Sequence, residues 1–192
     1  MKWGYQIPKF KLLINARVET AHLKKRFIPF LKSNRCVVII EGYFEWKDKT
    51  PYCFHPSKKG HDHIYLASFY TQTKDVVILT RQAKENLNKI HNRMPVILSE
   101  DLLDLWLNTD NKYMDFIDKK ILHESNSAYE DLKFYKLAPY VNKIKNKDVK
   151  CLMTKENYMK HLDSVGIKKY FGVAPKKKKI IPKLAKEEEQ EL

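Results

Sequence analysis

The chain has 192 residues, enough for one domain with a sizeable core and some additional length, but too few for two full domains. Its 37 Lys and Arg residues outnumber its 23 Asp and Glu residues, and the net charge of +14 favours polyanionic partners, nucleic acid above all. The sequence has no run of about 18 apolar residues, no apolar N-terminal block and only three widely spaced cysteines, so we expect an intracellular protein without a membrane span or disulfide framework.

The first polar pattern places an amide, a guanidinium and a carboxylate at Asn15, Arg17 and Glu19, separated by smaller residues. On an extended backbone these three side chains point to one face. Such a face suits either a binding site or a solvated edge strand. The following residues, 21–32, predict a short basic helix that ends near Pro29.

Residues 36–46 carry the most informative pattern, Cys-Val-Val-Ile-Ile-Glu-Gly-Tyr-Phe-Glu-Trp. Five apolar residues, four of them β-branched, predict a core strand buried on both faces. Glu45 follows between Phe44 and Trp46, where dry surroundings raise a carboxyl pKa, as a general acid requires. An ion pair with a neighbouring lysine at the strand end is the alternative.

Three further strands are predicted at residues 52–55, 63–71 and 76–80, and an antiparallel meander is the simplest arrangement. Cysteine and histidine residues lie among them at spacings that match no zinc pattern, so we predict neither a metal site nor a cofactor. These residues are Cys53, His55, His61 and His63.

Helical spacing over residues 82–90 leads to His91, just before a segment that Pro95 makes extended. A neutral imidazole near a helix C-terminus is placed to gain a proton, although capping and packing are common roles for such a histidine. A helix is predicted over residues 100–107, capped by Ser99 and burying Leu103, Trp106 and Leu107. The remaining predictions are helices over 113–122 and 154–163, a strand over 132–137 and a closing turn at 138–142.

The C-terminal part changes character, and we divide the chain into a domain over residues 1–153 and a segment over 154–192. From Ala174 onward lysines and then glutamates predict a disordered basic tail. Before it, an aliphatic residue precedes two aromatic residues by three positions, at Ile167, Tyr170 and Phe171. This spacing resembles the peptide by which replication and repair proteins bind the sliding clamp, while packing on the domain is the alternative.

Four blocks, taken in order, resemble the SRAP family, whose SOS-response-associated peptidase domains shield abasic sites in single-stranded DNA by covalent attachment. The resemblance implies an α+β fold in which a mixed or antiparallel, barrel-like β-sheet carries flanking short helices. The blocks are Trp-Gly-Tyr-Gln-Ile-Pro at 3–8, Asn-Ala-Arg-Val-Glu-Thr at 15–20, Arg-Cys-Val-Val-Ile-Ile-Glu-Gly-Tyr-Phe-Glu-Trp at 35–46 and His-Asn-Arg-Met-Pro-Val-Ile-Leu at 91–98.

The resemblance implies a basic groove that holds one DNA strand, with three catalytic residues. Asn15 matches the family asparagine that positions the reacting sugar, Glu45 the acid that assists imine formation, and His91 the histidine that helps open the deoxyribose ring and shuttles protons. The predicted DNA-binding residues are Arg17 at the phosphates, Arg93, and Trp3 as a platform for a base. For Trp3, simple packing is the alternative.

One position departs from the family pattern. The family nucleophile is a cysteine directly after the initiator methionine, whereas this sequence has Lys2 there. We therefore expect either a start upstream of this sequence or a relative that binds without cross-linking; an imine formed by the amine of Met1 or Lys2 is a third alternative. The two function hypotheses are an abasic-site cross-linking repair enzyme with peptidase-like or lyase-like self-release, and a catalytically inactive single-stranded DNA-binding module recruited by a sliding clamp. In both we expect a monomer, located in the nucleus or wherever replication takes place.

Overall fold

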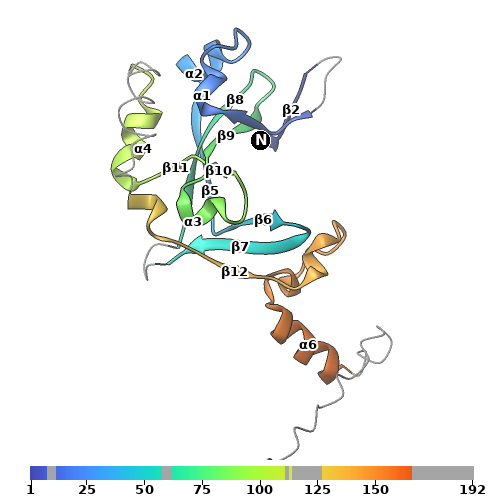
Figure 1. Cartoon of the computed structure of the whole chain (residues 1–192). Coiled ribbons are helices and arrows are strands. Elements are labelled where there is room, and N and C mark those ends of the chain that lie inside the picture. The colour runs from blue at the N-terminus through green and yellow to red at the C-terminus, as the bar shows by residue number, and fades with distance from the viewer. Residues whose placement is uncertain (8–11, 58–61, 111–112, 114–126, 166–192) are drawn as a thin grey trace, which may run out of the picture.

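The protein has an α+β fold, as predicted, in which most strands belong to one central sheet (Figure 1). The computed structural model describes residues 1–7, 12–57, 62–110, 113 and 127–165. Within these residues the strands form a seven-stranded sheet, a three-stranded sheet and a two-stranded hairpin, and the sheets do not close into a barrel. The expectation of a barrel-like sheet was therefore wrong.

Strand β9 (Asp75–Gln82) is the centre of the large sheet. β8 (Ile64–Tyr70) pairs with it antiparallel, and β5 (Arg35–Ile40) and β11 (Ile97–Leu98) pair antiparallel with β8. β1 (Lys2–Trp3) and β4 (Asn15–Arg17) pair with β9 in parallel, and β10 (Arg93–Pro95) pairs with it antiparallel. Between β1 and β4, β2 (Tyr5–Gln6) and β3 (Leu12–Leu13) pair as a separate hairpin. The N-terminal strands β1 and β4 thus both join the large sheet through β9.

A second sheet contains β6 (Tyr43–Lys47), β7 (Thr50–Pro56) and β12 (Leu132–Lys136), all antiparallel. Asp48 and Lys49 connect β6 to β7 with φ angles of 47° and 67°, as a two-residue hairpin turn requires. The predicted single meander was wrong because β5 pairs with β8 and leaves the β6–β7 hairpin to form this other sheet.

The two faces of the large sheet pack on different hydrophobic clusters. Val77 and Leu79 face the first cluster, which α1 (Val18–Ala21), α2 (Ile28–Ser33) and α4 (Glu100–Leu107) cover. Trp106 of α4 is fully buried there, and its indole N–H donates to the Cys36 carbonyl at 2.9 Å. Ile78, which lies between Val77 and Leu79 on β9, points to the opposite face. There it packs with Leu66 of β8 in the second cluster, between the two sheets.

Several predicted helices differ from the observed ones. The helix predicted over 21–32 was wrong: α2 begins beside Pro29, because proline suits a first turn, where its missing N–H costs no hydrogen bond. α3 (Glu85–Asn88) is shorter than predicted. α4 is confirmed, but it buries Leu102 with Trp106 and leaves Leu107 exposed.

The C-terminal part of the described chain consists of short helical turns. η2 (Ser127–Tyr129) precedes β12, η3 (Pro139–Asn142) and η4 (Val149–Leu152) follow it, and α6 (Lys155–Ser164) is confirmed as predicted. Most of the helix predicted over 113–122, the candidate clamp peptide at 167–171 and the tail lie outside the described residues. Among the residues described, no helix is both long and apolar enough to span a membrane.

Candidate functional site

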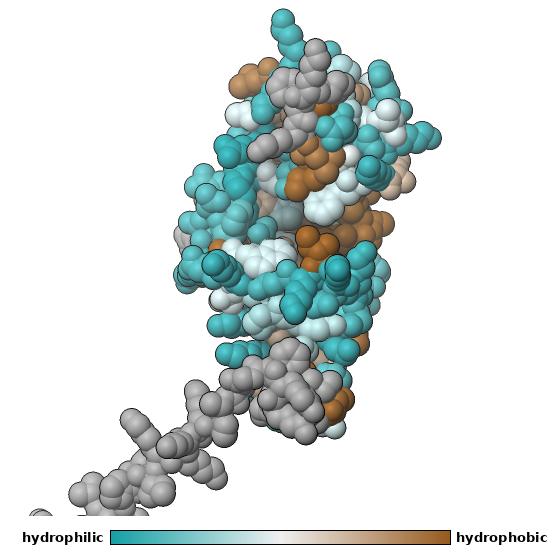
Figure 2. Space-filling view, turned by 90° about the vertical axis from the view of Figure 1, so that its right-hand side faces the viewer, coloured by the Kyte–Doolittle hydropathy of each residue, from teal (hydrophilic) through white to brown (hydrophobic). Residues whose placement is uncertain are grey.

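One groove is lined by all six residues that the sequence analysis proposed as catalytic or DNA-binding. It has a volume of about 670 Å³, and its floor is the face of the large sheet formed by residues of β5, β8 and β9, while β6 supplies a wall. Figure 2 shows apolar and weakly polar side chains across the middle of one face of the molecule, between hydrophilic regions. The six residues are Trp3, Asn15, Arg17, Glu45, His91 and Arg93.

The register on β9 explains how the N-terminal residues converge. Residues paired across neighbouring strands point to the same face of a sheet, and residues two apart along one strand also share a face. Trp3 pairs with Val76, Asn15 with Ile78, and Arg17 with Thr80, and all six of these residues line the groove. The predicted common face of Asn15 and Arg17 is therefore observed. Glu19 does not share this face, because it belongs to α1, and its carboxylate pairs with Arg93.

Glu45 and His91 lie within ion-pair distance of each other in the groove. The Glu45 Oε2 atom lies 3.8 Å from His91 Nδ1, and the two side chains are 25% and 43% exposed. Burial raises the pKa of the Glu45 carboxyl above its usual value, although the charge of His91 and a backbone hydrogen bond at Trp46 oppose the shift. The carboxyl can therefore hold its proton to a higher pH than an exposed glutamate.

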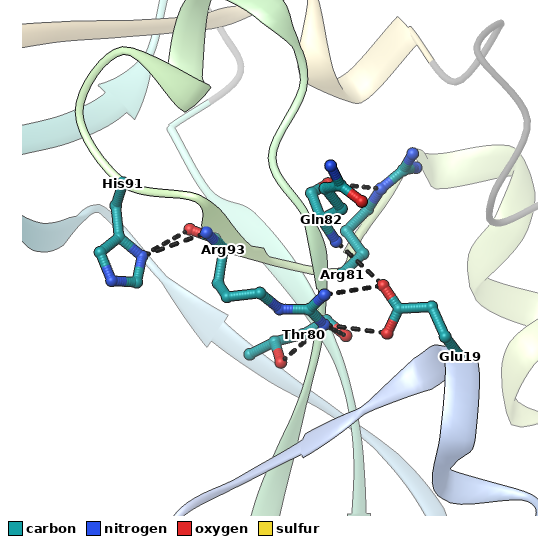
Figure 3. Close-up of polar contacts among 6 residues, drawn as sticks. All are labelled: Glu19, Thr80, Arg81, Gln82, His91 and Arg93. Carbon is teal, nitrogen blue, oxygen red and sulfur yellow. Dashed lines mark hydrogen bonds and ion pairs between the residues drawn. The ribbon is translucent and has the colours of Figure 1, made fainter.

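The His91 ring is held by the backbone of Arg93. The Arg93 N–H lies 3.2 Å from His91 Nδ1, and the Arg93 carbonyl oxygen lies 3.0 Å from the same atom (Figure 3). A deprotonated Nδ1 accepts from the N–H, while a protonated Nδ1 donates to the carbonyl. The imidazole can therefore change its protonation state at Nδ1 without losing its backbone partner.

The Arg93 side chain ties three elements together (Figure 3). Its two terminal nitrogens donate to the Glu19 carboxylate at 2.8 and 3.0 Å, and one of them also donates to the Thr80 carbonyl at 2.7 Å. The Gln82 backbone N–H donates to the same carboxylate at 3.0 Å. Partial burial opposes ionisation of Glu19, but its hydrogen bonds and the charge of Arg93 outweigh burial and lower the pKa of this carboxyl. This network joins α1, β9 and β10 directly beside His91.

The two arginines of the groove thus differ in this structure. The Arg93 guanidinium is engaged by Glu19 and Thr80, and its buried Nε has no hydrogen-bond partner among the described residues. Arg17 is exposed and has no ion pair within the described part of the chain. The unbound chain therefore offers the Arg17 charge to solvent, while a DNA contact by Arg93 stays a prediction.

Trp3 lines the groove from strand β1. Its indole N–H donates to the Ile14 carbonyl at 3.0 Å, directly before Asn15, and the residue is 57% exposed. The hydrogen bond fixes the ring, and its exposure leaves surface for a planar ligand. Both roles foreseen for Trp3 are thus compatible with its position.

The SOS response associated peptidase (SRAP) family model matches residues 1–144. The chain belongs to the SRAP family. Its relatives include the abasic site processing protein YoaM of Bacillus subtilis (strain 168), 30% identical over 176 residues that cover 83% of this chain and 76% of YoaM. The abasic site processing protein HMCES of Gallus gallus is 26% identical, over 80% of this chain and 56% of that protein.

Solved structures show the same fold. A protein from Bacteroides thetaiotaomicron superposes with a TM-score of 0.61 at 21% identity, over 74% of this SRAP chain and 66% of the other. A phage-related protein from Bordetella bronchiseptica gives a TM-score of 0.58 at 21% identity, over 72% and 70% of the two chains.

Asn142 contacts Trp46, a lining residue of this SRAP groove, and sequence reasoning did not foresee this contact. The Trp46 indole N–H donates to Asn142 Oδ1 at 2.8 Å, and the Asn142 amide donates to the Lys49 carbonyl at 3.1 Å. Asn142 thereby holds the tip of the hairpin whose first strand carries Glu45. The sequence indicated a turn at this position but not the contact with Trp46, because a hydrogen bond between residues 96 positions apart leaves no local pattern.

The thiols of Cys36 and Cys53 in this SRAP chain are poor nucleophiles, because burial disfavours the reactive thiolate. Burial raises the pKa of the Cys36 thiol to about 11, and it also raises the pKa of Cys53. Among the described residues, no three His, Cys, Asp or Glu side chains are grouped as a metal site would need. The groove itself offers a carboxyl, an imidazole and an amide, at Glu45, His91 and Asn15.

Proposed function

We propose that this chain binds single-stranded DNA at abasic sites and processes them through an imine. The observation that carries the proposal is the convergence in one groove of a partly buried carboxyl with a raised pKa, an imidazole 3.8 Å away and an exposed arginine. Relatives named abasic site processing proteins, among them YoaM and HMCES, support the same assignment.

The groups of the groove suit imine chemistry on the open form of an abasic sugar, which carries an aldehyde. A primary amine of the chain, that of Met1 or Lys2, attacks the aldehyde carbon and forms a C–N bond. One N–H proton passes to the aldehyde oxygen, giving a carbinolamine. Glu45 in its acid form donates a proton to the departing hydroxyl, which leaves as water, and His91 accepts the proton released by the nitrogen. Asn15, beside them in the groove, can hold the sugar by hydrogen bonds.

Arg17 and Trp3 supply binding in this proposal. An exposed guanidinium on the groove pairs with a backbone phosphate and contributes a salt-sensitive, sequence-independent affinity. The exposed ring of Trp3 offers a stacking surface for a neighbouring base. Both contacts explain binding without a requirement for a particular sequence, as damage recognition needs.

A trapping experiment tests the proposal. The chain is incubated with single-stranded DNA carrying one abasic site, with and without sodium borohydride, which reduces an imine to a stable amine. We expect a conjugate that survives denaturing electrophoresis, and none with intact DNA or with a tetrahydrofuran analogue that has no aldehyde. If the chain neither conjugates nor prefers abasic DNA, the proposal is wrong.

Retained salt-sensitive binding without any conjugate would instead favour the alternative of a non-catalytic DNA-binding module. We propose that in either case Ile167, Tyr170 and Phe171 recruit the chain to a sliding clamp, as a clamp pull-down with alanine at these three positions would test. Loss of the pull-down is the expected result, and an unchanged pull-down would exclude this role.

A further inference from the structure

We propose that a second groove, distinct from the first, binds the phosphodiester backbone of the nucleic acid that flanks the reacting nucleotide. This inference rests on the proposed function and extends it to a second surface. The groove has a volume of about 940 Å³ and is lined by seven of the residues 81–89 and by five residues of the 129–134 segment. We call it the flank groove.

The charge of the flank groove fits a polyanion. Four cationic side chains line it, and Glu130 is the single carboxylate among its lining residues. Phosphate groups are recognised chiefly by such lysine and arginine clusters, without a need for base contacts. The cations are Arg81, Lys84, Lys89 and Lys133.

Two of these cations are held in place by one aromatic ring. The Arg81 guanidinium lies 5.1 Å and the Lys84 ammonium 5.0 Å from the centroid of the Tyr129 ring. Tyr129 is itself buried, and its hydroxyl accepts the Ile97 backbone N–H at 3.2 Å. Because the ring is fixed, the two charges are already ordered, and less conformational entropy is lost when a phosphate binds.

An aromatic ring in the flank groove is available for a base. Phe134 is 37% exposed, and its inner side packs on Phe54 at 5.2 Å and Tyr52 at 6.1 Å between ring centroids. A ring that is anchored on one side and exposed on the other is a suitable stacking surface for a base. Cations beside such a ring match the composition of single-strand binding surfaces.

One segment of the chain connects the two grooves. Lys84 and Lys89 line the flank groove, whereas His91 and Arg93, a few residues later, line the first groove. Gln82, which also lines the flank groove, donates its backbone N–H to Glu19, the partner of Arg93. A DNA strand bound at His91 is therefore separated from the cations of the flank groove by one short segment of the chain.

The test compares oligonucleotides that differ only in length beyond the abasic site. One set is short enough to fill the first groove alone, and the other extends it by about ten nucleotides, either single-stranded or duplex, within the span that one binding fold covers. Binding is measured across a series of salt concentrations for the wild type, Lys84→Glu/Lys133→Glu, and Lys133→Glu alone. The matched control is Lys25→Glu/Lys32→Glu, with the same charge change at two exposed positions near α2.

We expect the flank-groove double variant to reduce the slope of log K against log salt by about 1.4 for a single-stranded extension, or about 1.8 for a duplex one, from two lost phosphate contacts. The short oligonucleotide should bind all variants alike, and the control should leave the long-DNA slope unchanged. Whichever extension shows the loss identifies the form of nucleic acid bound. Lys133→Glu changes an exposed residue, so its expected half-sized effect holds even if the double variant folds poorly.

Equal slopes for the double variant and the control on both extensions would overturn the flank groove while leaving the proposed function intact. A wild type that ignores the short abasic DNA, but binds the extended intact DNA in a Lys133-dependent way, would retain the flank groove and reject the proposed function. A wild type that binds none of these DNAs would reject both.

Discussion

Replacing Arg93 by lysine tests whether the network beside His91 supports the fold. Lysine keeps the charge but loses the planar fork that reaches both Glu19 oxygens and the Thr80 carbonyl together. At least two hydrogen bonds are lost in consequence. The network lies among α1, β9 and β10, so the free energy of unfolding should fall.

The size of the loss follows from the geometry. A hydrogen bond contributes about 0.5–1.5 kcal/mol net, so two of them account for about 1–3 kcal/mol. Glu19 is 37% exposed, and solvent screening limits the ion-pair share to about 0–1 kcal/mol. Because lysine keeps the charge, we expect Arg93→Lys to cost about 1–3 kcal/mol from the lost hydrogen bonds, with a change in melting temperature of about 2–4 °C per kcal/mol.

Urea unfolding followed by tryptophan fluorescence measures the loss, because the midpoint shifts at constant slope when only stability changes. The matched control is Arg17→Lys, the same substitution at an exposed arginine of the same groove, which should change stability by less than about 0.5 kcal/mol. A loss for Arg93→Lys no greater than that for Arg17→Lys would refute the reasoning.

Three further predictions concern Glu45, Gly42 and Asn142. Glu45→Gln should slow conjugate formation about 10²–10⁴-fold while DNA binding persists, as a gel time course and a binding titration would show. Burial raises the pKa of Glu45 in the folded state, so the free energy of unfolding should fall as the pH rises from the carboxyl pKa of the unfolded chain through the higher pKa of the folded one. Glu45→Gln should remove this pH dependence, as urea titrations at several pH values would show. A pH profile that the substitution leaves unchanged would contradict the assignment. Gly42→Ala should destabilise the hairpin by about 1–3 kcal/mol, since the added Cβ would lie 2.6 Å from the Phe54 carbonyl oxygen; a thermal midpoint equal to that of the wild type would contradict this. Asn142→Ala removes both hydrogen bonds at the hairpin tip and should cost about 1 kcal/mol, seen as faster amide exchange across β6 and β7; exchange unchanged there would show that the tip needs no such support.

The sequence predicted the strands of the site better than their partners. The apolar runs that became β5, β8 and β9 were found because local composition is enough to identify a strand. The sequence did not show that β5 pairs with β8, since strand pairing depends on contacts between distant residues. Burial on both faces was also wrong for β5, because Ile39 is 60% exposed.

The proposed site residues came from a family resemblance and from residue chemistry, and the structure places all six in one groove. Their catalytic and DNA-binding roles stay predictions. The engagement of Arg93 by Glu19 could not be foreseen, because the two residues are 74 positions apart and form an ordinary ion pair whose location depends on how β4 and β10 both meet β9. The family resemblance and local residue chemistry thus pointed to the groove residues, but not to the distant contacts that position them.

The chain leaves β9 after Trp3 and returns to it at Asn15, and the β2–β3 hairpin lies between these two contacts. Both contacts are fixed by their own pairing with β9, so the length of the intervening hairpin does not determine where the indole and the amide lie. A peptide tag or a fluorescent label inserted between Gln6 and Leu12 should therefore report on a ligand entering from that side without displacing either group.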